Sequence, residues 1–553
     1  MKNKKSFNNY FFNRKFNRKF LFIFFSAVFI FTAGFSSAPC FAENNVYLRI
    51  TPSYEATIGL PQFNPGVGAA VSLDWAFWSI TRKLSAGVSA GGGVSTLPIE
   101  SGDSLVLFNG KAGPFVRWRP LDRLSVRGGI NAGVYQFSWK DTEYLKFLSA
   151  GSLGVEYHLL PFLSLSADGI YTHRVFSEDL PMSSISASIG LTLNLSELIN
   201  SRNRVRMEKT HQYRVFPVSW AWYENNPVAQ VMITNDEPNS ITDISLSFFL
   251  DSYMGQPWTF AQLPRLASGS NVEVPVTALF NEVMLSLTEN VNANGVIQIK
   301  YRSLGALKEA VFPIQMPIFH RNTLSWDDDR RAAAFVSPRD GSARIFARYV
   351  QNVVDLGLPA NVSSVPANVR YAAALFEALR LYGISYVVVP TMSFVNMHAD
   401  ESALDNVTYP YETLYYRGGD CTYLSILYCS LLEALNIETA FITIPGHLYM
   451  AFEVGDKNWL AGSHDIIEIE TDGVLKRWLP VEVTVPEEGF VRAWRIGARE
   501  WRNSGEKAEI FPIRECWEVY PSVTISVSID YPPEMPEDTE IIRAAVRELT
   551  PLR

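Results

Sequence analysis

Cysteine is scarce in this sequence, because its 553 residues include only four. Cys40 lies in an N-terminal segment that we expect to be removed, which leaves Cys421, Cys429 and Cys516. Three is an odd number, and their spacing is not that of a disulfide framework. Each thiol therefore needs another explanation, which is either burial or chemistry. We predict that Cys429, which lies among Leu and Tyr residues, and Cys516 are structural.

Charged residues are also few, at 19% of the chain, whereas apolar residues make up 47% and aromatic residues 13%. A low charged fraction with a high aromatic fraction suggests that one part of the chain faces a membrane. The apolar fraction is large enough to bury sizeable cores. The chain is too long for one ordinary core, so we predict two to four domains.

Motifs that hold metal ions and phosphates are missing. No His, Cys and Asp cluster has the spacing of a zinc site. Residues 327–329 are three aspartates, but the downstream Gly and Glu of a calcium loop do not follow them. The run Gly91-Gly92-Gly93 belongs to an alternating strand pattern and not to a phosphate loop. We therefore expect no metal and no cofactor.

The N-terminus has the three parts of an export signal. Seven basic residues and no acid occur in residues 1–19, an uncharged apolar run fills residues 20–35, and small Ala42 precedes polar Glu43. This order predicts a signal peptide at residues 1–42, with an uncleaved anchor as the alternative. Its removal changes the formal net charge from −8 to −8 − 7 = −15. A chain this acidic is not expected to bind nucleic acid.

Residues 43–197 follow one pattern, in which apolar residues alternate with small or polar ones. In residues 185–195, for example, every second residue is Ile, Ala or Leu. A period of two with one apolar face predicts β-strands. Eight strands are predicted, near residues 46–55, 66–79, 83–95, 105–118, 123–138, 147–159, 163–175 and 184–195. Eight strands are enough to close an antiparallel barrel.

Such a barrel could cross a membrane or be soluble, since strands alternate in both cases. We expect very short turns near residues 81–82, 119–122 and 160–162 and mostly longer connections at the other end, as in outer-membrane barrels. The second face is Gly and Ser with a few charges, which suits a polar interior. We therefore predict an outer-membrane-type β-barrel with lipid as a partner. No apolar run of membrane-spanning length follows the signal, so no later transmembrane helix is expected.

Residues 198–209 are polar and contain three arginines, and we interpret them as a linker. About seven predicted strands in residues 210–317 fit an immunoglobulin-like β-sandwich, which we interpret as a spacer or binding module. Residues 318–525 have an α+β pattern, with helices predicted at residues 342–356, 367–382 and 421–435. Residues 526–553 form a C-terminal extension with a short helix near residues 537–548.

Residues 410–452 contain the pattern that indicates chemistry. Gly418 and Gly419 permit a tight turn, and Asp420 is a good N-cap residue, so a helix should begin at Cys421. The free N–H groups and the positive dipole end of a helix favour the thiolate of a cysteine in its first turn. The backbone N–H of Cys421 is also placed to stabilise an oxyanion.

His447 is the expected partner of Cys421. A helix followed by a strand and Pro445-Gly446 should return His447 to the start of the helix, where it can act as base or ion-pair partner. An acidic residue should orient the imidazole. Glu482 is the candidate and Asp465 is the alternative.

These residues resemble the transglutaminase-like superfamily, which includes transglutaminases and bacterial cysteine peptidases with a papain-like Cys-His-Asp/Glu triad. The resemblance covers roughly residues 320–525, and it is carried by Gly-Asp-Cys at a helix start, a Leu-rich helix ending in ALNI, and Pro-Gly-His before an aromatic strand. It implies that Cys421 is the nucleophile, His447 the base and Glu482 the third residue. The sequence departs from the family in having Glu instead of Asp, and in an apparent insertion at residues 461–476.

Two functions are compatible with these features. The first is thiol-dependent acyl transfer on a peptide or protein, in which water gives a peptidase or amidase and an amine gives cross-linking. The second is a non-catalytic envelope scaffold whose transglutaminase-like domain binds peptide or peptidoglycan. A pore or adhesin function of the barrel can coexist with either. Because an even strand count leaves both barrel ends on one side, we expect an outer-membrane protein with periplasmic C-terminal domains.

Overall fold

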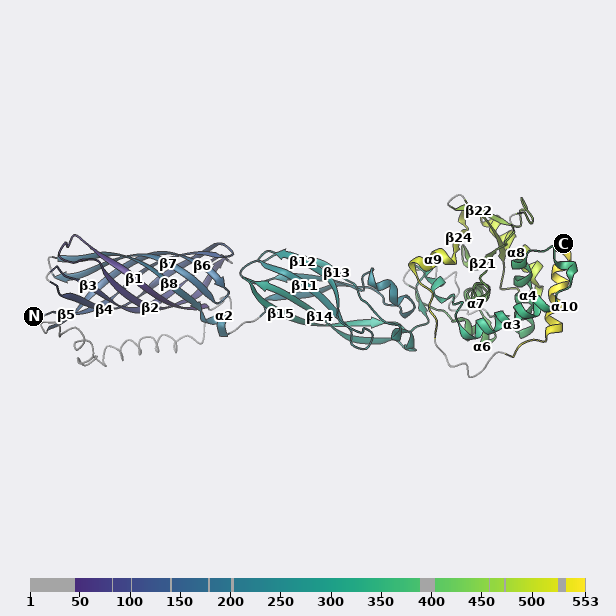
Figure 1. Cartoon of the computed structure of the whole chain (residues 1–553), viewed down its shortest axis with the longest axis horizontal. Helices are drawn as coiled ribbons and strands as arrows, with labels where there is room; N and C mark the ends of the chain where they lie inside the picture. Colours follow the sequence, from purple (N-terminus) through teal and green to yellow (C-terminus); the bar gives the residue numbers. More distant parts are fainter. Residues whose placement is uncertain are drawn as a thin grey trace, which may run out of the picture.

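The computed structural model describes residues 45–81, 83–100, 102–139, 142–177, 180–199, 203–387, 403–456, 458–471, 474–525 and 534–552. The predicted signal peptide lies outside these residues. Figure 1 shows three parts in chain order along an elongated molecule: a barrel, a pair of sheets, and a mixed α/β part. Within the described ranges, no helix combines the length and the apolar character that crossing a membrane would need.

The first part is a closed antiparallel barrel of eight strands, as the alternation predicted. Each strand pairs with the next, and β1 closes on β8 with Tyr47 opposite Asn194. Both chain ends therefore leave the barrel at the same end. The strands are β1 (Asn45–Ile58), β2 (Gly66–Thr81), β3 (Leu84–Pro98), β4 (Ser104–Leu121), β5 (Leu124–Trp139), β6 (Thr142–Leu160), β7 (Leu163–Ser177) and β8 (Leu180–Asn194).

The barrel carries its apolar face on the outside. Ile130, Phe147 and Leu153 are 71%, 74% and 66% exposed, whereas Arg127 and Glu156 are 3% and 1% exposed. A soluble barrel would do the reverse, because water drives apolar side chains into the core. The arrangement is the one predicted for a barrel that faces lipid.

The predicted difference in turn length between the two barrel ends is wrong at two places. Only residues 140–141 separate β5 from β6, and only residues 178–179 separate β7 from β8. The longer connections at that end are residues 59–65 and 99–103. The strands extend past the alternating residues because backbone pairing continues along the wall, as between Trp139 and Thr142.

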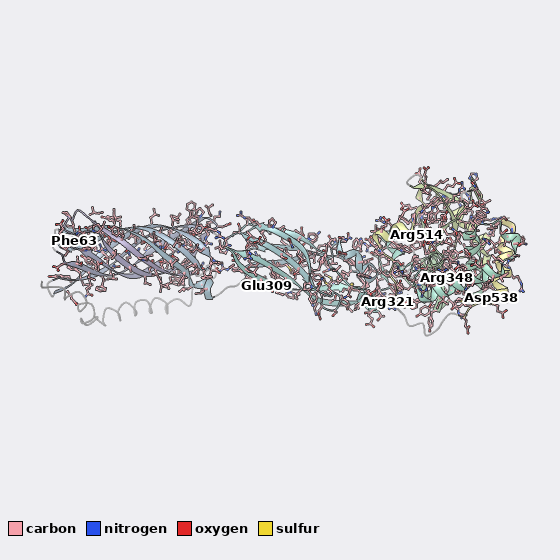
Figure 2. All side chains as sticks on the ribbon, in the orientation of Figure 1. Phe63, Glu309, Arg321, Arg348, Arg514 and Asp538 are labelled. Atoms are coloured by element: carbon pink, nitrogen blue, oxygen red, sulfur yellow. The ribbon has the colours of Figure 1, made fainter. Side chains whose placement is uncertain are left out.

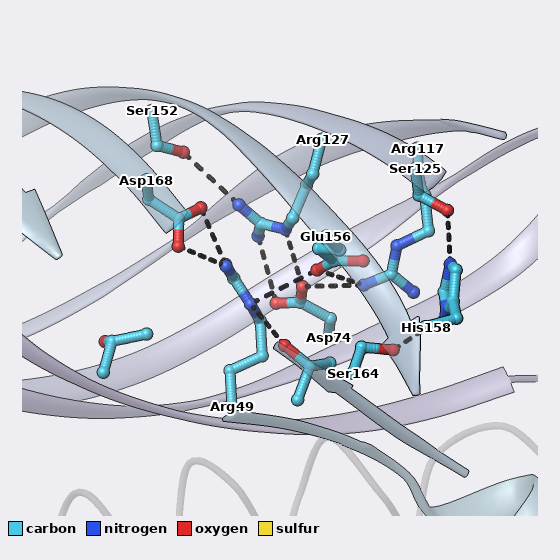
Figure 3. Close-up of polar contacts among 12 residues, drawn as sticks. Arg49, Asp74, Arg117, Ser125, Arg127, Ser152, Glu156, His158, Ser164 and Asp168 are labelled. Atoms are coloured by element: carbon cyan, nitrogen blue, oxygen red, sulfur yellow. Dashed lines mark hydrogen bonds and ion pairs between the residues drawn. The ribbon is translucent and has the colours of Figure 1, made fainter. Parts of the chain in front are cut away.

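Side chains of two kinds fill the barrel interior. In the half that holds the start of β1 and the end of β8, Arg49 pairs with Asp168 at 2.7 Å, Arg127 with Asp74 at 2.7 Å and Arg117 with Glu156 at 3.0 Å (Figure 3). The other half has an apolar cluster of Leu97, Leu105, Leu107, Tyr135, Phe137, Leu148 and Met182. Phe63, labelled at that end of the molecule in Figure 2, packs against this cluster.

The second part is a two-sheet sandwich with the strand orders β13-β10-β9 and β12-β11-β14-β15 around one apolar core. Its immunoglobulin-like character stays a prediction. The strands are β9 (Val205–Gln212), β10 (Ala229–Asn235), β11 (Ile241–Phe249), β12 (Trp258–Leu266), β13 (Asn271–Val276), β14 (Val291–Ser303) and β15 (Ala306–Ile318). The linker prediction is wrong in part, because β9 begins inside residues 198–209 and pairs with β10. Its charged residues hid it, since an edge strand exposes most of its side chains.

The third part has a five-stranded antiparallel sheet in the order β22-β23-β21-β20-β24. Its strands are β20 (Thr439–Ile444), β21 (His447–Glu453), β22 (Ile467–Thr471), β23 (Val474–Val481) and β24 (Glu509–Pro512). Short strands β16 (Thr323–Leu324), β17 (Ser385–Tyr386), β18 (Asp405–Asn406) and β19 (Gly418–Gly419) pair outside this sheet. The residues predicted to be an insertion thus contain β22 and the start of β23, which form an edge of the sheet.

Helices pack with this sheet around a large core. They are α3 (Gly341–Gly357), α4 (Ala367–Tyr382), α6 (Pro410–Tyr416), α7 (Cys421–Ala434), α8 (Phe490–Ser504), α9 (Ile513–Val519) and α10 (Asp538–Leu549), while α2 (Leu195–Ile199) follows the barrel. Ile541, Ala545 and Leu549 of α10 belong to the same core as α7. The helix predicted in the C-terminal extension is therefore an integral element of this part.

Candidate functional site

The site begins at the first turn of α7. The Asp420 side chain accepts a hydrogen bond from the Tyr423 backbone N–H at 3.0 Å, so it caps the helix as expected. Cys421 is the first helical residue and is only 6% exposed. A Cβ atom on Gly419 would lie 2.6 Å from the Cβ of Tyr423, so only glycine lets the chain approach the helix this closely.

A parallel bridge brings Tyr386 to the same place. β17 pairs with β19, with Tyr386 opposite Gly419. Burial raises the pKa of the Tyr386 phenol, and the charges of Cys421, Asp420 and Glu482 raise it further. Sequence reasoning missed this residue as part of the site. Nothing in the sequence specified that β17 pairs with β19, and this pairing is what places Tyr386 beside Gly419.

His447 opens β21 directly after Gly446, which has a φ of 79°. Its Nε2 atom lies 2.6 Å from Oε2 of Glu482, and its side chain also interacts with Cys421. The imidazole stacks on the Tyr449 ring, with 5.6 Å between centroids and 18° between planes. The ring is therefore held on two edges and one face.

The partners of His447 favour its charged form. Burial by itself would lower the pKa of the imidazole, but the hydrogen bonds to Cys421 and Glu482 and the charges of both groups raise it to about 10. Burial would raise the pKa of Glu482, whereas the hydrogen bond and the charge of His447 lower it. An imidazolium beside a carboxylate is the expected state of this pair.

The structure brings Cys421, His447 and Glu482 together and leaves Asp465 elsewhere. Oε1 of Glu482 accepts hydrogen bonds from the backbone N–H and the hydroxyl of Thr484, which fix the carboxylate. Asp465 instead forms an ion pair with Arg502 at 2.7 Å, and its side chain is 40% exposed. Of the two acids considered from the sequence, Glu482 is the one that contacts His447.

A fourth group, Glu500 of α8, was missed by sequence reasoning. Its Oε2 atom lies 3.9 Å from Nε2 of His447. The ligand atoms of His447, Glu482 and Glu500 lie within 4.8 Å of one another, so this is where the described residues could hold a cation. His447 Nε2 is, however, already engaged with Glu482. The apolar spacing of Phe490, Ala493 and Trp494 could have predicted α8 but not its place beside β23.

The two other thiols lie away from this arrangement. Cys429 and Cys516 are buried, as predicted. Burial raises the pKa of Cys429 well above its ordinary value and that of Cys516 to about 12. Both are therefore poor nucleophiles at neutral pH, and they serve as internal references for the reactivity of Cys421.

Several solved structures that are similar to this chain match about a quarter of its length. No family model and no curated protein matches the sequence. Similar solved structures include neisserial surface protein A, at 11% identity over 27% of this chain and 96% of its own, with a TM-score of 0.22. Ail of Yersinia pestis has 16% identity over 28% and 99%, with a TM-score of 0.20. The outer membrane enzyme PagL has 14% identity over 26% and 99%, with a TM-score of 0.21. TM-scores this low carry no argument about this chain.

Proposed function

We propose that the C-terminal part of the chain is a transglutaminase-like cysteine enzyme that transfers acyl groups of a peptide or protein substrate. One observation carries this proposal: Cys421 at the start of α7 interacts with the imidazole of His447, whose Nε2 lies 2.6 Å from Oε2 of Glu482. A nucleophile, a base and a group that orients the base are the parts that covalent acyl transfer needs.

In the first half of the reaction, the Cys421 thiolate attacks the carbonyl carbon of a carboxamide or peptide bond. The resulting oxyanion accepts a hydrogen bond from the Cys421 backbone N–H, and the Tyr386 phenol beside Cys421 is a candidate second donor. His447 gives its proton to the leaving nitrogen as the C–N bond breaks. The products are a thioester on Cys421 and the leaving group, which is ammonia from a carboxamide and an amine from a peptide bond.

In the second half, water or a second amine attacks the thioester carbon, and His447 takes the proton of the attacking group. The C–S bond breaks and the thiolate returns. With water the net reaction is hydrolysis, and with an amine it is cross-linking. Glu482 keeps the imidazole aligned in both halves and stabilises its positive charge.

The barrel supplies the proposed location. Its apolar exterior suits the outer membrane, and the start of β1 and the end of β8 lie together at the barrel end nearest the sandwich. We therefore place the sandwich and the enzyme part in the periplasm. Protease added to intact cells should leave the C-terminal part uncut, and its removal from intact cells would contradict this location.

Alkylation of the detergent-solubilised full chain with iodoacetamide tests the catalytic proposal. At about pH 6, we expect Cys421 to react at least about tenfold faster than N-acetylcysteine, because the imidazolium stabilises its thiolate. His447→Ala should remove this advantage. Mass spectrometry of the cysteine-containing peptides separates Cys421 from Cys429 and Cys516, which should stay unlabelled in the folded chain.

A different outcome of the alkylation experiment would support the second function, a non-catalytic scaffold. If Cys421 reacts no faster than the free thiol and His447→Ala changes nothing, the part is a non-catalytic scaffold that binds peptide or peptidoglycan. If Cys421 is alkylated fast but carboxamide peptides are not turned over, the nucleophile is supported and the proposed substrate class is wrong.

A further inference from the structure

The geometry of α8 places Glu500 against the acid of the proposed triad. A Cβ atom on Gly497 would lie 3.2 Å from the backbone N of Glu482 and 3.2 Å from the backbone C of Pro480, so the missing side chain lets α8 lie directly on the end of β23. The Tyr449 hydroxyl donates a hydrogen bond to the Gly497 carbonyl at 3.2 Å. Glu500 follows one helical turn later on the same face.

Two carboxyl groups this close share a proton. One carboxylate oxygen of Glu482 and one of Glu500 lie within 4.8 Å of each other, so two negative charges here would repel and a proton on one of the groups relieves the repulsion. Oε2 of Glu500 is buried and has no hydrogen-bond donor among the described residues. A buried acceptor without a donor is costly, and a proton on Glu500 removes that cost. The imidazolium of His447 selects Glu482 as the ionised member.

We propose that Glu500 is a positioning residue of this site, whose protonated carboxyl group donates a hydrogen bond to Glu482 and so keeps one carboxylate aimed at His447. The inference rests on the proposed acyl-transfer function and adds a fourth side chain to it. Glu500 touches neither Cys421 nor the place where the substrate carbonyl would lie, so it acts through Glu482.

The surroundings of Glu500 decide when it loses its proton. It faces Glu482 after β23, His447 and Tyr449 on β21, and Arg499 on its own helix. Burial, the charge of Glu482 and their shared hydrogen bond raise the pKa of Glu500 to about 7, while the charges of His447 and Arg499 oppose the rise. Above about pH 7, a second negative charge therefore lies near the imidazolium and holds its proton more tightly.

Two substitutions separate hydrogen bonding from charge. Glu500→Gln keeps a donor for Glu482 but cannot ionise, whereas Glu500→Leu removes both properties. In iodoacetamide labelling of the full chain at about pH 6, we expect Glu500→Gln to stay within about twofold of wild type and Glu500→Leu to be at least about fivefold slower. Equal rates for the two variants would overturn the hydrogen-bonding role.

The rise of the alkylation rate at high pH, which is the upper limb of the pH profile, tests the effect of the negative charge on Glu500. Alkylation should accelerate where His447 loses its proton, and Glu500→Gln should move this limb down by about one pH unit, because the nearby carboxylate is gone. An unmoved limb would overturn the proposal even if Glu500→Leu fails to fold. Glu506→Gln, at an exposed position just after α8, is the matched control and should leave the limb in place.

The two proposals fail in different ways. A wild-type Cys421 that reacts no faster than a free thiol overturns the enzyme and, with it, the role of Glu500. A fast Cys421 that depends on His447, together with an unmoved limb in Glu500→Gln, overturns the role of Glu500 alone.

Discussion

The barrel interior and the Cys421 site both bury clusters of charged side chains, but they arrange them in opposite ways. In the barrel cluster of Figure 3, three arginines face three acids, and each of these arginines has an acid of its own at 2.7–3.0 Å. In the C-terminal part, a thiol and two carboxyl groups converge on the single imidazole of His447. The barrel cluster balances its charges, whereas the proposed site sets a thiol and two carboxyl groups against one imidazole.

This difference separates a structural use of buried charge from a chemical one. Each guanidinium of the barrel cluster is hydrogen-bonded to a carboxylate of its own, so the cluster fixes a geometry. A site that must pass protons needs groups whose ionisation states compete. His447, with a pKa raised to about 10, and Glu500, with a pKa raised to about 7, meet that need.

Asp74→Ala should give the largest effect and should be confined to the barrel. It removes the partner of Arg127, and Arg117 also lies 4.0 Å from Asp74, so a buried positive charge is left unpaired. We expect a loss of about 3–5 kcal/mol in the free energy of unfolding of the barrel. Denaturant titration in lipid vesicles, followed by the gel mobility of folded barrel, measures it.

Two controls sharpen this prediction. Asp103→Ala, at an exposed position between β3 and β4, should cost little. Asp74→Leu combined with Arg127→Leu should be less destabilising than either change alone, because no charge is left without a partner. Cys421 alkylation should be the same in all of these variants, and a change there would contradict the independence of the two clusters.

Glu482→Gln should have the second largest effect, on reactivity instead of stability. Without the carboxylate, the imidazolium loses its charge partner, and we expect Cys421 alkylation near pH 6 to fall by roughly 10²-fold. Asp465→Asn is the matched control, because Asp465 pairs with Arg502 and should leave the rate unchanged. The opposite ranking of the two variants would make Asp465 the acid of the site.

The stability of the C-terminal part should depend on pH through His447. Its folded pKa of about 10 lies above the ordinary 6.5, so the stabilisation is fully present below pH 6.5 and is lost as pH rises through 10. We expect the free energy of unfolding, from denaturant titration read out by pulse labelling of buried Cys429, to fall over this range by an amount on the order of 1–3 kcal/mol.

His447→Ala should flatten that pH dependence. An equal fall in the His447→Ala chain would trace the effect to another group.

The smallest effect is expected at the contact between barrel and sandwich. Arg265 pairs with Asp122 at 3.1 Å, but their side chains are 63% and 38% exposed. Water and salt screen such a pair, so Asp122→Ala should change the free energy of unfolding by less than about 1 kcal/mol. A loss as large as that of Asp74→Ala would show that exposure does not separate the two kinds of ion pair.

Local patterns predicted the barrel well because the alternation of residues along each strand shows which side chains face the outside and which face the interior. Every second residue of 185–195 is apolar, and the structure exposes Ile185, Ile189 and Leu191 toward the outside. The pattern could not say where the strands stop, so β6 and β8 begin earlier than expected. It also missed β9, whose exposed charged residues conceal the alternation.

The sequence by itself determined the eight strands and the helix that begins at Cys421, because periodicity and capping act between residues that are close in the chain. It also identified His447, because one helix followed by one strand brings the chain back to the start of that helix. Only the tertiary structure decided that Glu482 and not Asp465 contacts His447, and that Glu500 and Tyr386 join them. These contacts depend on how β23, α8 and β17 pack, and side-chain patterns within each element do not encode that packing.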